Sequence, residues 1–411
     1  MENELQAVTP AGRQLVARAG RFAEAFAPAA ARYDREGAFP YEHLEALRDD
    51  GFLYAPAPAE AGGLGVESAH DLMVASSRVS RGDPSLMLGA NMHWIVFHTF
   101  ARQRRVALNR GDERRVEAVT ANMRRLVAEK AFIAAAVSEG DQDLLRPKTT
   151  VTYDGATWRL NGRKIISSGA PAATHFTVAA RADLEGEERY LYAFVPREAP
   201  GVTVLDDWDA LGMRASASCT VVFEDVELPG FYPGKGAPAG VITAQYLEET
   251  LISGPAHAAA ALGVAEAAHA ASVAAVERKR LRAPGEPVRP FVQERAAENS
   301  IDLAATRAVF SRSLLMVDEY HATHPAERGT LAEVGPVFAE VQRAKAFINA
   351  AAVRIADRAM AMAGGAGYMN GAPLARAYRD ARAGAFMHPL GANVAMDYLG
   401  SQALGLQPER L

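Results

Sequence analysis

Residues 149–160 read TTVTYDGATWRL and carry the strongest structural signal in the chain. Two runs rich in β-branched and aromatic residues flank the pair Asp154-Gly155. An Asp-Gly pair between two such runs favours a tight hairpin, because both turn residues must adopt positive φ. We therefore predict two antiparallel strands joined by a two-residue turn.

The β pattern continues beyond this hairpin. Short strand-like runs follow at regular spacing, with turn residues between them, over residues 175–180, 189–195, 202–205 and 219–223. Such spacing is typical of a small antiparallel barrel or sandwich of ~90–100 residues.

Helical periodicity dominates on both sides of the β region. The predicted helices span residues 11–31, 42–50, 69–81 and 86–103 before it, and 243–281, 292–319, 332–363 and 391–404 after it. Long antiparallel helices of ~25–35 residues favour a four-helix bundle. We predict an α+β protein with three domains: an N-terminal helical domain (1–132), a central antiparallel β-barrel (133–235) and a C-terminal four-helix bundle (236–411).

Composition excludes several classes of function. The chain has 411 residues and a net charge of −5, which argues against nucleic acid as a partner, since phosphate binding needs a basic surface. A single cysteine, Cys219, rules out an internal disulfide framework and a cysteine-based zinc site, and we predict no metal. The apolar run 251–276 is interrupted by Gly, Pro, His and Glu, and predicts a buried helix, not a membrane span. We expect a cytoplasmic protein without a signal peptide.

The order helix, barrel, helix resembles the acyl-CoA dehydrogenase fold, and four segments resemble that family's signatures in the right order. They are PAEAGGLG (58–65), WRLNGRKIISSGAPAATHF (158–176), DALGMRASASCTVVFEDVELP (209–229) and AGGAGYMNGAPLARAYRDAR (363–382). This resemblance covers nearly the whole chain and is specific for the fold. It is less specific for the reaction, because function lives in sites grafted on folds.

Two departures from the family pattern bear on the chemistry. In much of the family a Glu lies nine residues after the Arg of the RDAR-like motif and removes a proton beside a thioester carbonyl; counted from Arg379, that position is His388. In a second branch the base falls near Ile252 or Ser253, and neither is acidic, although Glu248 and Glu249 are about one turn away. The segment 137–143 also lacks the Gly-Ser-Asp that receives coenzyme A.

These departures resemble the flavin-dependent monooxygenases of the same fold: phenol hydroxylases, dibenzothiophene monooxygenases and amino-sugar nitrososynthases. The segments 207–214 and 382–389 are most similar to the nitrososynthase branch. The resemblance implies a reduced flavin supplied by a separate reductase, dioxygen as co-substrate, and oxygenation of a small molecule such as an amine or a phenol. Two alternatives stay open: an acyl-CoA dehydrogenase with a relocated base such as Glu249, and a non-catalytic flavin-binding relative.

The resemblance also implies roles for individual residues. His388 is the candidate catalytic residue, and an unperturbed imidazole with a pKa of ~6.5 is a suitable base near neutral pH. Candidate substrate-pocket residues are His93, Trp94 and Ser253. Candidate flavin-binding residues are Val137, Ser138, Ser167, Ser168, Arg278, Gly364 and Gly365, of which the last three would act across the subunit interface of a homotetramer. The Phe-Gly that follows the family's diphosphate-binding Arg is absent after Arg278, which favours FMN over FAD.

Overall fold

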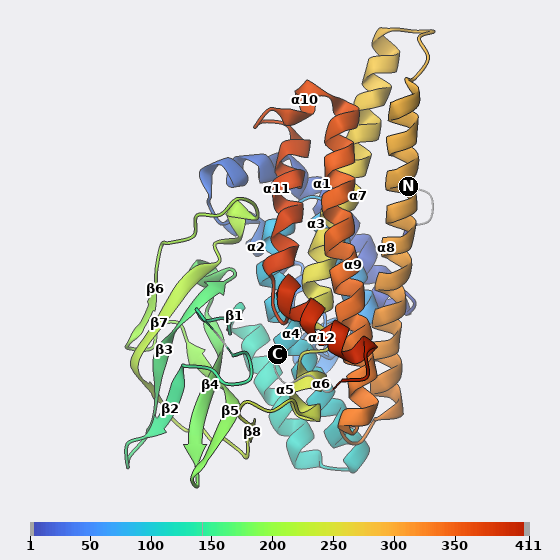
Figure 1. Cartoon of the computed structure of the whole chain (residues 1–411). Coiled ribbons are helices and arrows are strands. Elements are labelled where there is room, and N and C mark those ends of the chain that lie inside the picture. Colours follow the sequence, from blue (N-terminus) through green and yellow to red (C-terminus); the bar gives the residue numbers. More distant parts are fainter. Residues whose placement is uncertain (1–3, 142, 407–411) are drawn as a thin grey trace.

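The computed structural model describes residues 4–141 and 143–406. Figure 1 shows long helices that run side by side, with a sheet packed against one side of them. The predicted fold class is confirmed, because a helical region, a sheet region and a second helical region follow one another along the chain.

The first helical region precedes the sheet and ends at Ala128. Its helices are α1 (Pro10–Glu36), α2 (Tyr41–Asp49), α3 (Ala69–Ser80), α4 (Pro84–Arg110) and α5 (Glu113–Ala128). Asp83 caps α4 by accepting a hydrogen bond from the Leu86 N–H, and Pro84 occupies the first turn, where no N–H is needed.

Helix α5 was not among the predicted helices. It is rich in Arg and Glu and buries one narrow apolar stripe, formed by Val119, Met123 and Leu126. Such a stripe is a weak signal in a window dominated by charged residues, although its spacing is that of one helix face.

Eight strands form one sheet in the described part of the chain. They are β1 (Ile133–Ala136), β2 (Thr150–Tyr153), β3 (Trp158–Ser167), β4 (His175–Leu184), β5 (Glu187–Pro196), β6 (Val202–Val204), β7 (Cys219–Leu228) and β8 (Ala237–Pro238). The hydrogen-bonded order is β6-β7-β3-β2-β4-β5-β8, with β1 paired to β4. Strands β1 and β2 both pair with β4 in parallel, so the sheet is mixed, not purely antiparallel.

The hairpin turn differs from the predicted one. Four residues, 154–157, join β2 to β3, and within the turn only Gly155 has positive φ. The Asp154 carboxylate instead accepts hydrogen bonds from the N–H groups of Ala156 and Thr157, both at 2.9 Å. Local capping by an Asp side chain has therefore replaced the two-residue turn.

The second helical region follows β8. It consists of α6 (Ala244–Glu249), α7 (Ser253–Arg282), α8 (Pro290–Thr323), α9 (Leu331–Ala363), α10 (Gly365–Tyr368), α11 (Pro373–Ala383) and α12 (Ala392–Ala403), with a short 3₁₀ turn, η5 (Gly384–Phe386), after α11. Helices α7, α8, α9 and α11 lie along one another and form the bundle.

One predicted helix is broken into α6 and α7. Pro255 has no N–H, and it occurs in the first turn of α7, where none is required. Thr250 ends α6, and its hydroxyl donates to the carbonyl of Tyr246 at 2.7 Å. Helix α6, which this break separates from α7, contributes to the site described below.

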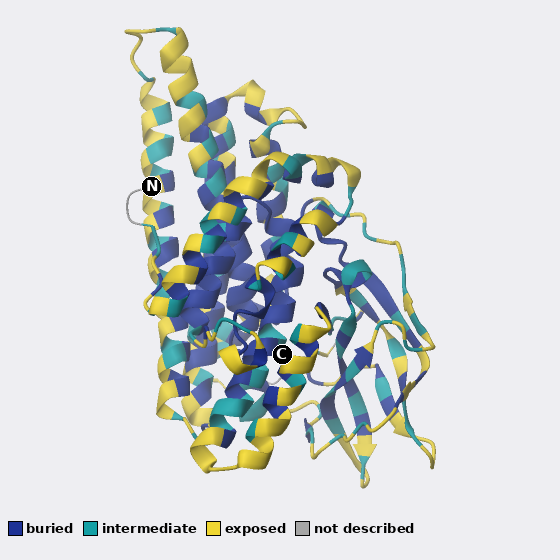
Figure 2. Ribbon diagram, turned by 180° about the vertical axis from the view of Figure 1, so that it is seen from behind, coloured by how far each residue is buried: buried dark blue, intermediate teal, exposed yellow. Residues whose placement is uncertain are grey.

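The stretch Ala244–Arg282 is the one segment of the described residues that is long and apolar enough to cross a membrane. In the fold it contributes to the core: residues 253–266 of α7 are all buried. Helix α7 packs against α3, α4, α9 and α11. Figure 2 shows this buried centre and the exposed far end of the α7–α8 hairpin. Its apolarity is thus accounted for by packing between helices.

Candidate active site

A cavity of about 680 Å³ lies between the sheet and the helices. Its walls come from α4, α5, β1, β3, β4, β5, α6, α7 and η5, together with the segments 137–138, 233–236 and 387–388 and the residue after β3. The structure brings five of the predicted site residues together here: Val137, Ser138, Ser168, Ser253 and His388.

The sheet wall of the cavity offers polar groups of the kind that a flavin ring edge needs. The Ser168 hydroxyl lies 2.8 Å from that of Ser218, and the Ser138 carbonyl accepts the Ile165 N–H at 2.8 Å. Ser167 is fully buried, and its hydroxyl has no hydrogen-bond partner among the described residues. Ser167 is not among the residues that line the cavity, whereas Val137, Ser138 and Ser168 are. A cavity of this size fits a flavin, for which these three lining residues would supply the contacts.

Ile166 lies in the same wall in an unusual conformation. Its φ is +55°, a region that β-branched residues rarely adopt, and the pairing of β3 with β7 shifts register between Lys164 and Ser167. The bulge leaves Ile166 41% exposed and lining the cavity. Strain of this kind persists where surrounding contacts enforce it, and it clusters at functional sites.

The segment that departs from the family's thioester loop turns inward at Glu139. Its carboxylate accepts hydrogen bonds from Lys164 Nζ at 2.7 Å and from the N–H groups of Lys148 and Thr149. Lys164 also donates to the Val137 carbonyl, and burial lowers the pKa of Lys164 to about 8. This buried ion pair fixes the backbone of Val137 and Ser138 beneath the cavity.

His388 lines the cavity at its helical side. Burial, reinforced by the charges of Lys345 and Lys164, lowers its pKa to about 3. Nδ1 of the ring has no hydrogen-bond partner among the described residues. The imidazole therefore stays neutral at physiological pH, and the expectation of an ordinary pKa near 6.5 is not met.

His257 was missed by the sequence analysis, although it lines the same cavity. It is 6% exposed, and within the described residues neither ring nitrogen has a partner. Burial, with the charges of Lys345 and His388, holds its pKa well below the ordinary value. The available signal was a lone histidine in the alanine-rich run 256–261.

His93 and Trp94 are not brought to this cavity. His93 Nδ1 accepts the Ile133 N–H at 3.1 Å, and Trp94 donates to the Phe52 carbonyl at 3.2 Å, with both side chains fully buried. The α4 residues that line the cavity are Met92, Ile95, Val96, Thr99, Phe100 and Gln103. These positions share one helix face, whereas His93 and Trp94 point into the core.

Arg278 is near the end of α7, and Gly364 and Gly365 are in the turn between α9 and α10. Figure 1 shows α10 at the end of the bundle that is far from the sheet. The neighbouring Lys279 donates to the Ala363 carbonyl at 2.9 Å, which ties the end of α7 to the glycine turn after α9. All three predicted residues are exposed. They are absent from the lining of the cavity within this one chain.

Charged residues dominate the opposite end of the cavity, around α6. Glu249 lines the cavity, accepts a hydrogen bond from Gln245 at 3.1 Å, and pairs with Arg328 at 3.4 Å. Burial raises the pKa of Glu249, although the Arg328 charge opposes this effect.

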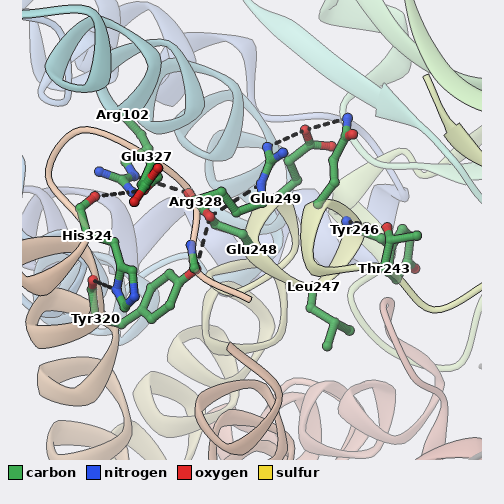
Figure 3. Close-up of polar contacts among 12 residues, drawn as sticks. Arg102, Thr243, Tyr246, Leu247, Glu248, Glu249, Tyr320, His324, Glu327 and Arg328 are labelled. Carbon is green, nitrogen blue, oxygen red and sulfur yellow. Dashed lines mark hydrogen bonds and ion pairs between the residues drawn. The ribbon is translucent and has the colours of Figure 1, made fainter. Parts of the chain in front are cut away.

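The adjacent Glu248 joins three elements (Figure 3). Its carboxylate accepts from Arg102 of α4 at 3.1 Å and from the Tyr320 hydroxyl of α8 at 3.0 Å, and pairs with Arg328 at 3.3 Å. A second cavity of about 410 Å³ opens here and shares Thr99, Gln103 and Glu249 with the first. Its lining holds four guanidinium groups, Arg102, Arg110, Arg115 and Arg328, against three carboxylates, Asp112, Glu248 and Glu249.

This fold and flavin-sized site are those of the acyl-CoA dehydrogenases. Models of the N-terminal, middle and C-terminal domains of acyl-CoA dehydrogenase match residues 9–103, 134–226 and 248–393. The chain belongs to this family and is a flavin-dependent oxidoreductase.

Within this family, the proteins that are similar to the chain include amino sugar nitrososynthases. The chain is 34% identical to the amino sugar nitrososynthase RubN8 of Streptomyces rubradiris, over 98% of this chain and 92% of that protein. It is also 34% identical to the amino sugar nitrososynthase DnmZ of Streptomyces peucetius, over 97% and 94% of the two chains. Among solved structures, KijD3 in complex with FMN and dTDP-3-amino-2,3,6-trideoxy-4-keto-3-methyl-D-glucose has a TM-score of 0.88 and 35% identity, with 98% and 96% of the two chains covered.

Proposed function

We propose that this protein is a flavin-dependent monooxygenase that oxygenates the amine nitrogen of an amino sugar carried on a nucleoside diphosphate. The observation that carries the proposal is the helical wall of the cavity, where two neutral histidines stand and the carboxylate of a thioester dehydrogenase is replaced by His388. The relatives named as amino sugar nitrososynthases support the substrate class.

The electrostatics of this wall suit an amine in its reactive form. An amine must be unprotonated to offer its lone pair, and the nearby charge of Lys345 disfavours an ammonium group on the substrate. His388 and His257 have acceptor nitrogens that can take hydrogen bonds from a neutral N–H₂ group. The wall therefore binds and orients the amine and keeps it neutral.

Reduced flavin fits the sheet wall, and we favour FMN, which is bound in the solved KijD3 structure. A bound reduced flavin would supply two electrons, so that one oxygen atom of dioxygen enters the substrate and the other leaves as water. Ser138 and Ser168, which line the cavity, would orient the ring, with the neighbouring Ser167 behind them. A separate reductase, a homotetramer and a cytoplasmic location remain predictions.

The second cavity suits the nucleoside diphosphate. Guanidinium groups match phosphate oxygens in charge and geometry, and Arg328 lies where the two cavities meet. An amine at His388 and a diphosphate near Arg328 would place one substrate along both cavities.

The direct experiment combines the protein, chemically reduced FMN and ¹⁸O₂ with dTDP-linked amino sugars, and follows the products by mass spectrometry. We expect ¹⁸O on the amine nitrogen. A matched test measures dTDP binding by calorimetry at fixed ionic strength: Arg328→Ala should weaken binding tenfold or more, whereas Arg295→Ala, on the exposed start of α8, should not. Unlabelled substrates throughout would contradict the proposal.

One observation favours a second function, that of an acyl-CoA dehydrogenase with Glu249 as its base. Glu249 lines the cavity, and burial raises its pKa, as a base for a weakly acidic carbon requires. Its ion pair with Arg328 and its hydrogen bond from Gln245 oppose that role. Bleaching of oxidised flavin by a panel of acyl-CoA thioesters, lost in Glu249→Gln, would establish this function instead.

A further inference from the structure

A buried lysine on α9 holds the segment that carries His388. Lys345 is 3% exposed, and its ammonium donates to the carbonyls of Met387 at 2.5 Å, His388 at 3.2 Å and Leu390 at 2.7 Å. This segment, residues 387–391, links η5 to α12 and has no helix or strand hydrogen-bond ladder of its own. Lys345 thus supplies hydrogen-bond donors to carbonyls that no helix or strand ladder satisfies.

A second residue of the same helix face secures the start of this segment. Asn349, one turn after Lys345, donates to the Gly384 carbonyl at 2.8 Å. The approach is so close that a Cβ on Gly384 would lie 2.4 Å from the Asn349 Oδ1. Helix α9 therefore forms hydrogen bonds to both ends of the stretch 384–390, which contains His388.

We propose that Lys345 is a positioning residue, whose ammonium fixes the segment that presents His388 to the cavity. The proposal rests on the proposed function only in that it takes His388 to act in the cavity. Lys345 itself does not line the cavity, so it acts through His388.

The number of acceptors identifies the protonation state that this role needs. Three carbonyls require three N–H donors, which an ammonium has and a neutral amine lacks. No carboxylate within the described residues forms an ion pair with Lys345, and burial lowers its pKa to about 7. The carbonyl dipoles thus take the place of a counter-ion.

The charge of Lys345 has a second consequence for the cavity. The charged and titratable groups that act on His388 are Lys345 and Lys164, and those that act on His257 are Lys345 and His388. Lys345 is common to both sets. Burial is the main cause of the low pKa of both histidines, and the Lys345 ammonium adds to it, so both rings stay unprotonated, as an amine-binding wall requires.

The test compares Lys345→Met with Lys279→Met, both without flavin or substrate. Lys279 also donates to two carbonyls, but at the far end of α9. In Lys345→Met we expect hydrogen exchange in residues 386–391 to speed up at least tenfold. We also expect the pKa values of His388 and His257, measured by NMR on histidine-labelled protein, to rise by about one unit. Lys279→Met should change neither.

Unchanged exchange and unchanged histidine pKa values in folded Lys345→Met would overturn the proposal. Should that variant not fold, the wild-type chain decides, because it has only six lysines to assign in a ¹⁵N-lysine spectrum. A slowly exchanging Lys345 ammonium, assigned by its coupling to the carbonyls of Met387, His388 and Leu390, supports the clamp, and a rapidly exchanging Lys345 signal without that coupling overturns it. Loss of oxygenation alone would instead bear on the proposed function.

Discussion

The two ends of the cavity wall differ in how they treat charge. Around α7 and the segment 387–390, two neutral histidines stand in front of a buried cation that no carboxylate of the described residues pairs with. Around α6, Glu248 and Glu249 are held by arginines and by the Tyr320 hydroxyl (Figure 3). At the first end the histidines stay unprotonated, and at the second end the glutamate carboxylates are paired with arginines.

The difference shows how one cavity can hold a substrate with two unlike parts. A neutral amine needs acceptors and a surrounding that disfavours its ammonium form, which the histidine end supplies. A diphosphate needs fixed cations, which are already in place at the other end.

The largest effect should come from the histidine end. His388→Ala removes the residue at the former carboxylate position, and we expect product formation to fall about 100-fold, because the amine loses a hydrogen-bond acceptor that orients it for reaction. Flavin binding, measured by fluorescence quenching, should remain. Full activity in this variant would remove His388 from the site, whereas loss of flavin binding would indicate a structural role.

At the charged end, we expect Glu248→Gln to act on stability. Its side chain is 8% exposed and faces Arg102, Arg328 and Tyr320. Removing one partner of a buried ionic network leaves the other charges uncompensated, and the expected loss is about 3 kcal/mol of unfolding free energy. Guanidinium denaturation at pH 7 measures it. Glu277→Gln, in an exposed i,i+3 pair with Arg280 on α7, is the control and should change stability by less than about 0.5 kcal/mol.

Much of the fold could be predicted from the sequence, since helical periodicity and the hairpin run are local signals. Helix α5 was missed because charged residues mask its apolar stripe, and the break at 250–252 depends on where Pro255 falls in the first turn. At the site, Val137, Ser138, Ser168, Ser253 and His388 converge on one cavity. By contrast, Lys345 and Arg328 gain their partners only from tertiary packing across 40 or more residues, which no local pattern reports.

The prediction that His93 and Trp94 of α4 line the substrate pocket differs from the structure because of the rotation of this helix. The correct helix was identified, but its rotation was not, and a shift of one residue turns a side chain by about 100°. Met92, Ile95 and Val96 face the cavity in their place. Aromatic and polar residues drew the prediction, whereas the cavity face of this helix is mostly apolar.

The pH dependence of the unfolding free energy should report on the histidine end of the cavity. The folded pKa of His388 is lowered to about 3 from an unfolded value of ~6.5, so the unfolded chain binds the proton first as pH falls. Its contribution to stability is complete above pH 6.5 and is lost on acidification. Between pH 6.5 and pH 5 this loss is about 1.5 kcal/mol. In His388→Asn, the difference between the denaturation midpoints at pH 6.5 and pH 5 should therefore be smaller than in the wild type. An unchanged difference would show that burial does not lower the pKa of His388.

The smallest effect should come from Gln245, which lies on the turn before Glu249. Gln245→Leu removes the hydrogen bond that favours the charged form of Glu249, so the pKa of Glu249 should rise further. Because Arg328 still pairs with this carboxylate, we expect only about 0.5 kcal/mol of lost stability at pH 7. Carboxyl NMR of glutamate-labelled protein would follow the titration directly. An unchanged Glu249 pKa would mean that burial and Arg328 set the charge of this carboxylate without a contribution from Gln245.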